Sequence, residues 1–249
     1  SPAEFIHFGT TTELRRLVTA DVEDYEFLDW KKQVSTKAPE TSAYAAHNSY
    51  VGKRARIACG AYLEDSYVLD ESVVGKGSVI SNVKLRNVTV PENVVLHGLK
   101  LLDGRYVVRI YGVEDNPKGT LEKDACFLGT TLSAFLSGNG LTPEALWKDG
   151  EHYLWFAALY PAADTMEEAI RSALLVKKMA EHSASPEEIE AWKNKERMSL
   201  YSSFNGADVL AISKWQHELE SRILASKFVW AIEAGTYYKE ALQVFGAHG

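Results

Sequence analysis

A recurrence of aliphatic side chains from about Ala43 to Leu96 constrains the fold more than any other feature. Each aliphatic is followed by a small, polar or acidic residue, and successive members lie five or six residues apart. One inward aliphatic at each edge is typical of a left-handed parallel β-helix, whose stacked triangular coils of roughly 18 residues bury one apolar column. Ordinary antiparallel strands are the alternative, which the five-residue steps leave open. The nine positions, enough for about three coils, are Val51, Ile57, Leu63, Leu69, Val74, Ile80, Leu85, Val90 and Leu96.

The segments that flank this repeat follow other patterns. Thr10 to Glu13 precedes a short apolar helix face, which predicts a helix with a threonine N-cap. The run Arg105 to Gly112 is rich in β-branched and aromatic residues and predicts a strand, and 115–119 is a turn by composition. Beyond Leu141 the pattern becomes helical, with a long helix over about 207–234 that Gly235 would end. The predicted helix caps are Thr142, Asp164 and Ser185.

These patterns predict an α+β fold: a short left-handed parallel β-helix with hexapeptide-like repeats, followed by an α-helical module. The β-helix is expected over 43–104, a strand and turn connector over 105–140 and a helical domain over 141–249. Residues 1–42 form a separate opening segment. The chain begins at Ser1 without methionine and runs directly into apolar residues, so we expect it to be cut from the middle of a longer fold.

Composition excludes several classes of protein. The 27 Lys and Arg against 34 Asp and Glu give a formal charge of −7, which argues against nucleic-acid binding through phosphate attraction. No apolar run approaches the roughly 20 residues of a membrane-spanning helix, so no membrane partner is expected. With two cysteines, Cys59 and Cys126, neither a disulfide scaffold nor a four-cysteine zinc site can form. A reducing cytoplasmic location fits best.

Familiar catalytic motifs are absent from the sequence. It has no phosphate loop of the GxxxxGK[ST] type, no GxGxxG, no HExxH and no GxSxG, and its seven histidines lack metal-ligand spacing. Gly75 to Ser78 is interpreted as a turn of the β-helix. His97, after the last repeat, is either a general base of the kind used by β-helix acyltransferases or a polar residue at an exposed corner. Glu114 to Asn116 either holds a hydroxylated ligand or forms a turn.

The opening segment, Phe5 to Thr10, resembles the aromatic-x-Asp-x-Gly-Thr motif of sugar-1-phosphate nucleotidyltransferases. His7 stands where that motif has a metal-associated aspartate, and Mg²⁺ prefers oxygen ligands to imidazole. We therefore expect hydrogen bonding to sugar or phosphate, or a structural role, rather than metal binding. The candidate substrate-binding residues are His7, Gly9, Thr10 and Thr11. No residue is proposed as catalytic and none as a metal ligand.

Four segments together resemble one family. Phe5-x-His7-x-Gly9-Thr10-Thr11-x-Glu13-Leu14 is similar to a segment of the fucose-1-phosphate guanylyltransferase (GDP-fucose pyrophosphorylase) family, and Gly112 to Lys118 resembles a second one. Asp164 to Ala169 and Ser199 to Asp208 resemble the helical region of the bifunctional enzymes in which the guanylyltransferase is fused to an L-fucokinase. The order of the segments strengthens the resemblance, which spans residue 5 to about 230.

The resemblance implies an enzyme of L-fucose salvage that phosphorylates fucose with ATP and then converts fucose 1-phosphate and GTP to GDP-fucose. It also implies Mg²⁺, GTP and ATP for the parent protein, and no cofactor in this part. Residues 1–42 would be the tail of a nucleotidyltransferase domain with its connector. The expected partners are an upstream guanylyltransferase domain and a downstream fucokinase domain of the same polypeptide, and a homo-oligomer is possible. The chain alone is expected to be an inactive spacer.

Two other classes of function remain open from the residues. One is a trimeric hexapeptide-repeat acyltransferase with His97 as its base. The other is a structural or oligomerisation module whose tryptophan-rich helices dock domains or subunits.

Overall fold

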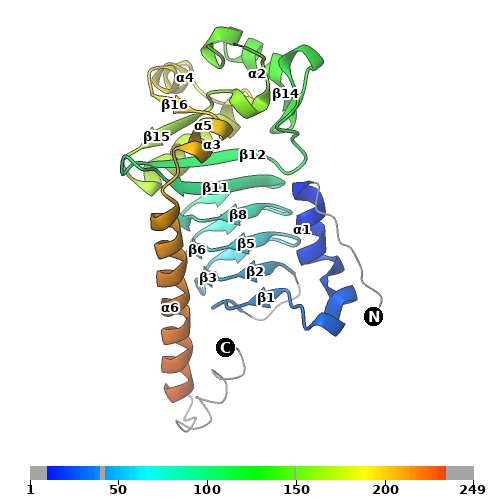
Figure 1. Ribbon diagram of the computed structural model, residues 1–249, viewed down its shortest axis with the longest axis vertical. Coiled ribbons are helices and arrows are strands. Elements are labelled where there is room, and N and C mark those ends of the chain that lie inside the picture. Colours follow the sequence, from blue (N-terminus) through cyan, green and yellow to red (C-terminus); the bar gives the residue numbers. More distant parts are fainter. Residues whose placement is uncertain (1–9, 40–42, 149, 234–249) are drawn as a thin grey trace.

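The computed structural model describes residues 10–39, 43–148 and 150–233. Figure 1 shows a stack of short parallel strands, flanked by the helix α1 (Thr11–Thr19) along one edge and the long helix α6 (Val209–Glu233) along the other. A lobe of helices and antiparallel strands caps one end of the stack. In the described ranges, no helix combines the length and the apolar character that a membrane span requires.

The parallel strands form a β-solenoid with three sheets, which confirms the predicted α+β fold with a β-helix. Its first sheet has five parallel rungs, and its turns are about four in number. These rungs are β1 (Gln33–Val34), β2 (Ala45–His47), β5 (Tyr62–Glu64), β8 (Val79–Ser81) and β11 (Val94–Lys100). The second sheet contains β3 (Tyr50–Val51), β6 (Tyr67–Val68) and β9 (Lys84–Leu85). The third contains β4 (Arg56–Ile57), β7 (Val73–Val74) and β10 (Thr89–Val90).

The register gives the length of a coil. Leu63 pairs with Ile80 and Ile80 with Leu96, so equivalent positions lie 17 and then 16 residues apart, as the corner hydrogen bonds also do. The predicted column is correct at eight of its nine positions. Leu69 is wrong, because the adjacent Val68 pairs with Leu85 and is fully buried, while Leu69 lies at the edge of the core. Two aliphatics stand side by side there, and only the stacking register selects between them.

Corners between the first and second sheets repeat one backbone conformation. Asn48, Asp65 and Asn82 all have positive φ, of 41°, 46° and 53°, in the left-handed region that Asn and Asp tolerate better than other L residues. A buried serine follows at Ser66, whose hydroxyl accepts a hydrogen bond from the backbone N–H of Val83 in the next coil at 3.2 Å. Polar corner side chains thus supply partners for backbone groups that the short strands leave unpaired.

At Gly75 two coils approach closely. A Cβ at this position would lie 2.5 Å from the carbonyl carbon of Pro91 and 2.6 Å from its oxygen. The equivalent position one coil earlier is Ala58, whose N–H bonds to Val74 as that of Gly75 bonds to Val90. Gly75 and Gly77 lie between β7 and β8, which confirms the interpretation of this glycine-rich stretch as a turn.

Gly75→Ala is therefore expected to destabilise the chain by about 1–3 kcal/mol, the cost of overpacking against atoms that cannot move aside. Urea unfolding followed by tryptophan fluorescence measures it. Ala58→Gly, on the same edge, is the matched control and should cost no more than about 1 kcal/mol. A Gly75→Ala chain as stable as the parent would show that the coils can separate without cost.

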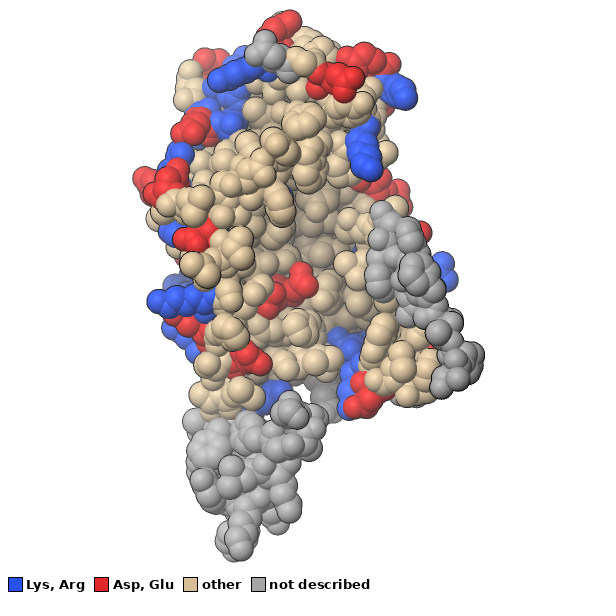
Figure 2. All heavy atoms as spheres, in the orientation of Figure 1, with Lys and Arg blue, Asp and Glu red and all other residues tan. Residues whose placement is uncertain are grey.

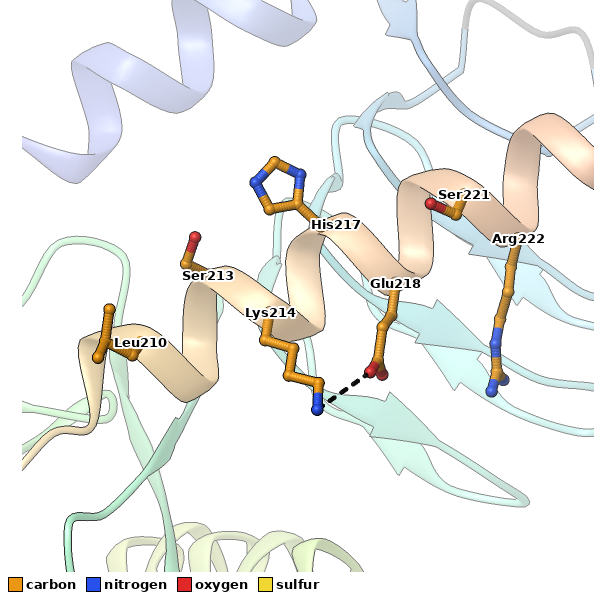
Figure 3. Close-up of a pocket in the computed structure, with 7 residues that line it drawn as sticks. All are labelled: Leu210, Ser213, Lys214, His217, Glu218, Ser221 and Arg222. Atoms are coloured by element: carbon orange, nitrogen blue, oxygen red, sulfur yellow. Dashed lines mark ion pairs between the residues drawn. The ribbon is translucent and has the colours of Figure 1, made fainter.

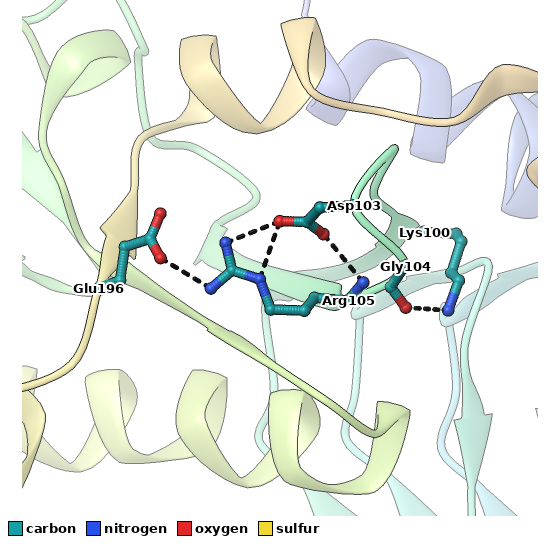
Figure 4. A network of polar contacts seen from close by, with 5 residues as sticks. All are labelled: Lys100, Asp103, Gly104, Arg105 and Glu196. Atoms are coloured by element: carbon teal, nitrogen blue, oxygen red, sulfur yellow. Dashed lines mark hydrogen bonds and ion pairs between the residues drawn. The ribbon is translucent and has the colours of Figure 1, made fainter.

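A hairpin closes the open end of the solenoid. Strand β12 (Tyr106–Gly112), predicted as Arg105 to Gly112, pairs antiparallel with β11, and β15 (Tyr160–Ala163) and β16 (Arg197–Met198) extend the sheet. Arg105 binds Asp103 within the hairpin loop and reaches Glu196 before β16 at 2.8 Å (Figure 4). Helix α3 (Met166–Ala180) packs on β12 and β15 and joins the cap to the solenoid core.

The cap contains short helical elements and a small hairpin. The hairpin strands are β13 (Cys126–Phe127) and β14 (Thr130–Thr131). The α-helices are α2 (Leu132–Gly138), α4 (Pro186–Lys193) and α5 (Leu200–Asn205). The 3₁₀ segments, of which the first lies beside α1, are η1 (Asp21–Leu28), η2 (Leu121–Lys123), η3 (Pro143–Ala145) and η4 (Leu154–Phe156).

The structure confirms one of the three predicted helix caps. Ser185 caps α4 with Glu188 in a capping box, as predicted. Asp164 is wrong by one residue, because Thr165 accepts the bond from the Glu168 N–H and caps α3. Thr142 makes no side-chain cap, and only the 3₁₀ turn η3 follows it. The predicted long helix is α6, which begins two residues later than expected, while Gly235 lies outside the described residues.

Helix α6 is attached to the corner column of the solenoid. Trp215 donates its indole N–H to the carbonyl of Asp65 at 2.9 Å, and the Gln216 amide donates to the Asp65 carboxylate at 2.8 Å. Leu219 and Ile223 form a small buried cluster with Tyr67. Because these residues lie at 215, 216, 219 and 223, one face of α6 packs on the solenoid and the opposite face is left exposed.

Candidate functional site

A row of polar side chains crosses the outer face of the first sheet. Leu63, Ile80 and Leu96 point inward, so each following residue points outward. The outward residues Glu64, Ser81 and His97 pair in register from β5 to β8 to β11, and His97 pairs with Arg109 on β12. We call Glu64, Ser81, His97 and Arg109 the polar row. Figure 2 shows this face hollowed over β8, β11 and β12, between the edges that carry α6 and α1.

The polar row has an acidic end and a basic end. The Ser81 hydroxyl donates to Oε2 of Glu64 at 3.0 Å, and Arg109 Nη2 donates to Nδ1 of His97. Arg109 and Ser81 are each only 7% exposed. Burial, together with the neighbouring guanidinium, lowers the pKa of His97 to about 3, and burial also lowers the pKa of Arg109. The imidazole is thus neutral at physiological pH.

Two phenols accompany the polar row. Tyr62 and Tyr111 belong to the adjacent outward column, which continues through Val79 and Val95. Burial raises the pKa of both phenols, and for Tyr62 the nearby carboxylate of Glu64 adds to the effect. Both therefore keep their protons and can donate hydrogen bonds. The outer face combines a carboxylate, hydroxyls, an imidazole and a guanidinium on a rigid sheet.

His97 does not lie where the sequence suggested. It stands within β11 rather than at an exposed corner, so that interpretation is wrong. Its low pKa also makes it a weak general base, because an efficient base has a pKa near the working pH. The physical environment of His97 therefore does not favour the acyltransferase hypothesis.

The candidate substrate-binding residues of the opening segment are divided by the structure. His7 and Gly9 lie outside the described residues. Thr10 caps α1 in a capping box: its Oγ1 accepts from the Glu13 N–H at 3.2 Å, and its own N–H donates to the Glu13 carboxylate at 2.9 Å. Thr11 is the first residue of α1. For Thr10 the structure provides a capping role, and substrate binding by these residues stays a prediction.

The opening segment meets the second segment of the resemblance. The Thr12 hydroxyl donates to the carbonyl of Val113 at 3.3 Å, across 101 residues of sequence. Asp115 follows, buried, and accepts from the N–H groups of Gly112 at 2.6 Å and Leu128 at 2.9 Å. Burial raises the pKa of Asp115. These bonds confirm the interpretation of Glu114 to Asn116 as a turn, which fixes the end of β12 next to α1.

Two hollows lie beside α6. The larger, of about 640 Å³, is lined only by side chains of the helix itself from Leu210 to Arg222, including Lys214 paired with Glu218 at 3.9 Å (Figure 3). The smaller, of about 250 Å³, lies between α6, the β11–β12 hairpin and Met166. The larger hollow brings together no groups from different elements, so it lacks the convergence that a binding site requires.

Metal ligation finds no support in the described ranges. There, no group of three or more His, Cys, Asp or Glu side chains is placed to hold a metal ion. The polar row contributes one carboxylate, Glu64, which accepts the Ser81 hydroxyl. The resemblance implies Mg²⁺ for the parent protein, and no step is assigned to it in the described part of the chain.

Sequence reasoning missed the polar row although its signal was present. Glu64, Ser81 and His97 each follow an inward aliphatic residue. These aliphatic residues occupy every third edge of the repeat, one in each coil. Such residues stack on one outer face once a coil takes 17 or 16 residues. The position of Arg109 depends on the hairpin register as well.

Two comparisons with known proteins identify the family of the chain. The model of the fucose pyrophosphorylase domain matches residues 1–165. The bifunctional fucokinase/GDP-fucose pyrophosphorylase of Arabidopsis thaliana is 27% identical over 217 residues, which cover 79% of this chain and 20% of the plant protein. The chain thus spans about one fifth of the length of this curated relative. Because the family model covers more than half of the sequence, the chain belongs to the fucose pyrophosphorylase domain family.

Proposed function

We propose that this chain is the central part of an enzyme of L-fucose salvage that phosphorylates L-fucose and then transfers GMP from GTP to fucose 1-phosphate. In the second reaction a phosphate oxygen of the sugar phosphate bonds to the α-phosphorus of GTP, and pyrophosphate leaves. The family match over residues 1–165 carries the proposal. The name of the plant relative, which joins both activities, supports the pairing with a fucokinase.

Within that enzyme we assign the chain a connecting role, without a complete active site. Support comes from apolar side chains around α5 and the start of α6, which are 45–83% exposed and would suit contact with further domains. Among them, the rings of Phe156 and Tyr201 pack edge to face, with 5.2 Å between their centroids. The exposed apolar residues of this region are Leu102, Phe156, Tyr201, Phe204, Val209 and Leu210.

The remaining catalytic parts would come from outside the described residues. Phosphoryl and nucleotidyl transfer depend on positioning and on charge neutralisation around Mg²⁺. We assign the binding of GTP, ATP and Mg²⁺ to upstream and downstream domains of the same polypeptide. A reducing compartment such as the cytoplasm is part of the proposal, and two free, exposed cysteines, Cys59 and Cys126, are compatible with it.

An assay of GDP-fucose formation from fucose 1-phosphate, GTP and Mg²⁺ tests the proposal. The isolated 249-residue chain is expected to show no turnover, and the full polypeptide that contains it is expected to be active and also to phosphorylate L-fucose. Turnover by the isolated chain would refute the connecting role. Failure of the full polypeptide to make GDP-fucose would refute the assignment to fucose salvage.

A further inference from the structure

Arg109 is a buried cation without a carboxylate partner. Arg109 lies on β12 and is 7% exposed. Its Nε is buried and has no hydrogen-bond partner in the described part of the chain. No ion pair links it to a described aspartate or glutamate, and the phenols of Tyr111 and Tyr160 lie near it. A buried guanidinium is strongly unfavourable unless an anion compensates its charge.

His97 adds a second donor beside this cation. Its Nδ1 accepts from Arg109 Nη2, so the neutral ring carries its proton on Nε2. The basic end of the polar row therefore places the Nε2–H of His97 beside the guanidinium of Arg109. The one carboxylate of the row, Glu64, is two strands away from His97 and accepts the Ser81 hydroxyl.

The chemistry of these donors selects an oxyanion. A guanidinium presents its N–H groups in a planar fork that matches the oxygens of phosphate, and such charge-assisted bonds are among the strongest in proteins. Donors from two side chains, on neighbouring strands, suit a tetrahedral group better than a planar carboxylate. The face on which they lie is hollowed over β8, β11 and β12 (Figure 2).

We propose that Arg109 and His97 form a binding site for a phosphoryl group on the outer face of the solenoid. The anion would lie against the outer face of the guanidinium and neutralise its charge. A phosphate monoester of a sugar and inorganic phosphate share this chemistry. The site goes beyond the proposed function, because phosphate binding by this face does not require that the polypeptide make GDP-fucose.

The test titrates the chain with inorganic phosphate and, separately, with fucose 1-phosphate at constant ionic strength. The NMR resonance of the Arg109 Nε–H reports binding at the residue itself. Saturable shifts with either probe support the site, and binding of the sugar phosphate alone identifies it as the source. Free L-fucose should give no shift. An Arg109 resonance that moves with neither probe at millimolar concentration overturns the proposal.

Variants separate this site from general charge attraction. Arg109→Met is expected to weaken affinity about tenfold or more, because the charged fork is lost. Arg56→Met, which removes an equal charge from an exposed position on β4, should leave affinity unchanged. Without phosphate, Arg109→Met should raise the melting temperature, and phosphate should raise that of the parent chain only. Equal affinities of the two variants would overturn the proposal. If Arg109→Met fails to fold, Arg109→Lys keeps the charge and should still bind more weakly.

The two proposals fail independently. Phosphate binding is measured on the chain alone and GDP-fucose formation on the full polypeptide. A missing Arg109 shift in an active enzyme rejects only the phosphate site, and an inactive full polypeptide that shows the shift rejects only the salvage function.

Discussion

Replacing Arg197 by methionine is expected to destabilise the chain by about 3 kcal/mol or more, because hydrogen bonds to a charged donor are each worth about 1.5–3 kcal/mol and this side chain makes four. Its guanidinium donates to the carbonyls of Ala158 at 3.1 Å, Trp192 at 3.1 Å, Lys193 at 2.6 Å and Ala145 at 2.8 Å. One side chain thus holds the C-terminal end of α4, the end of η3 and the segment between η4 and β15.

Urea unfolding of the whole chain, followed by tryptophan fluorescence, measures this loss. Arg197 also lies over the ring of Trp192, 4.2 Å from the centroid, so the methylene stem of methionine replaces only part of the contact. Arg105→Met is the matched control: its partners are the surface carboxylates of Asp103 and Glu196, and pairs of this kind contribute about 1 kcal/mol or less. An Arg197→Met chain as stable as Arg105→Met would show that water replaces the guanidinium at the four carbonyls.

The solenoid could be predicted because its chemistry repeats. Inward aliphatics recur at every edge, and corner residues such as Asn48 and Asp65 recur with the coil. The error at Leu69 arose where two aliphatics are adjacent, since hydrophobicity does not distinguish Val68 from Leu69. Only the register, which pairs Val68 with Leu85, does so.

The cap was less predictable because tertiary contacts determine its details. Ser185 and Glu188 form a local capping box, which sequence spacing identifies. Asp164 and Thr165 are adjacent and both are good caps, so spacing alone does not identify Thr165, which accepts from the Glu168 N–H. Arg197 carries no sequence signal for its role, because its four acceptors are backbone carbonyls from residues 145 to 193.

The candidate site depends on contacts that the sequence pattern alone does not predict. The opening segment and Gly112 to Lys118 were identified separately, and the bond from Thr12 to Val113 that joins them follows from the fold. The polar row required the coil length for Glu64, Ser81 and His97 and the hairpin register for Arg109. Stacking and register, which hydrophobic periodicity does not specify, therefore bring these functional groups together.

His97 is expected to make the stability of the chain depend on pH. Its pKa is about 3 in the folded chain against an ordinary value of 6.5, so between these values the unfolded chain binds a proton that the folded chain excludes. Stability from this group is fully present above pH 6.5 and is lost as the pH falls toward 3. The slope approaches about 1.4 kcal/mol per pH unit in the middle of that range.

Unfolding midpoints in urea between pH 7 and pH 4 measure this dependence against His97→Gln, whose amide oxygen can still accept from Arg109 but cannot bind a proton. The parent chain should lose stability more steeply than His97→Gln once the pH falls below about 6.5, while carboxylates contribute equally to both. His217→Gln is the control, because His217 lies on the exposed face of α6 with its side chain 79% exposed, and its slope should match that of the parent. Parallel curves for the parent and His97→Gln would mean that the folded chain accommodates a charged imidazole beside Arg109, which the burial of both side chains opposes.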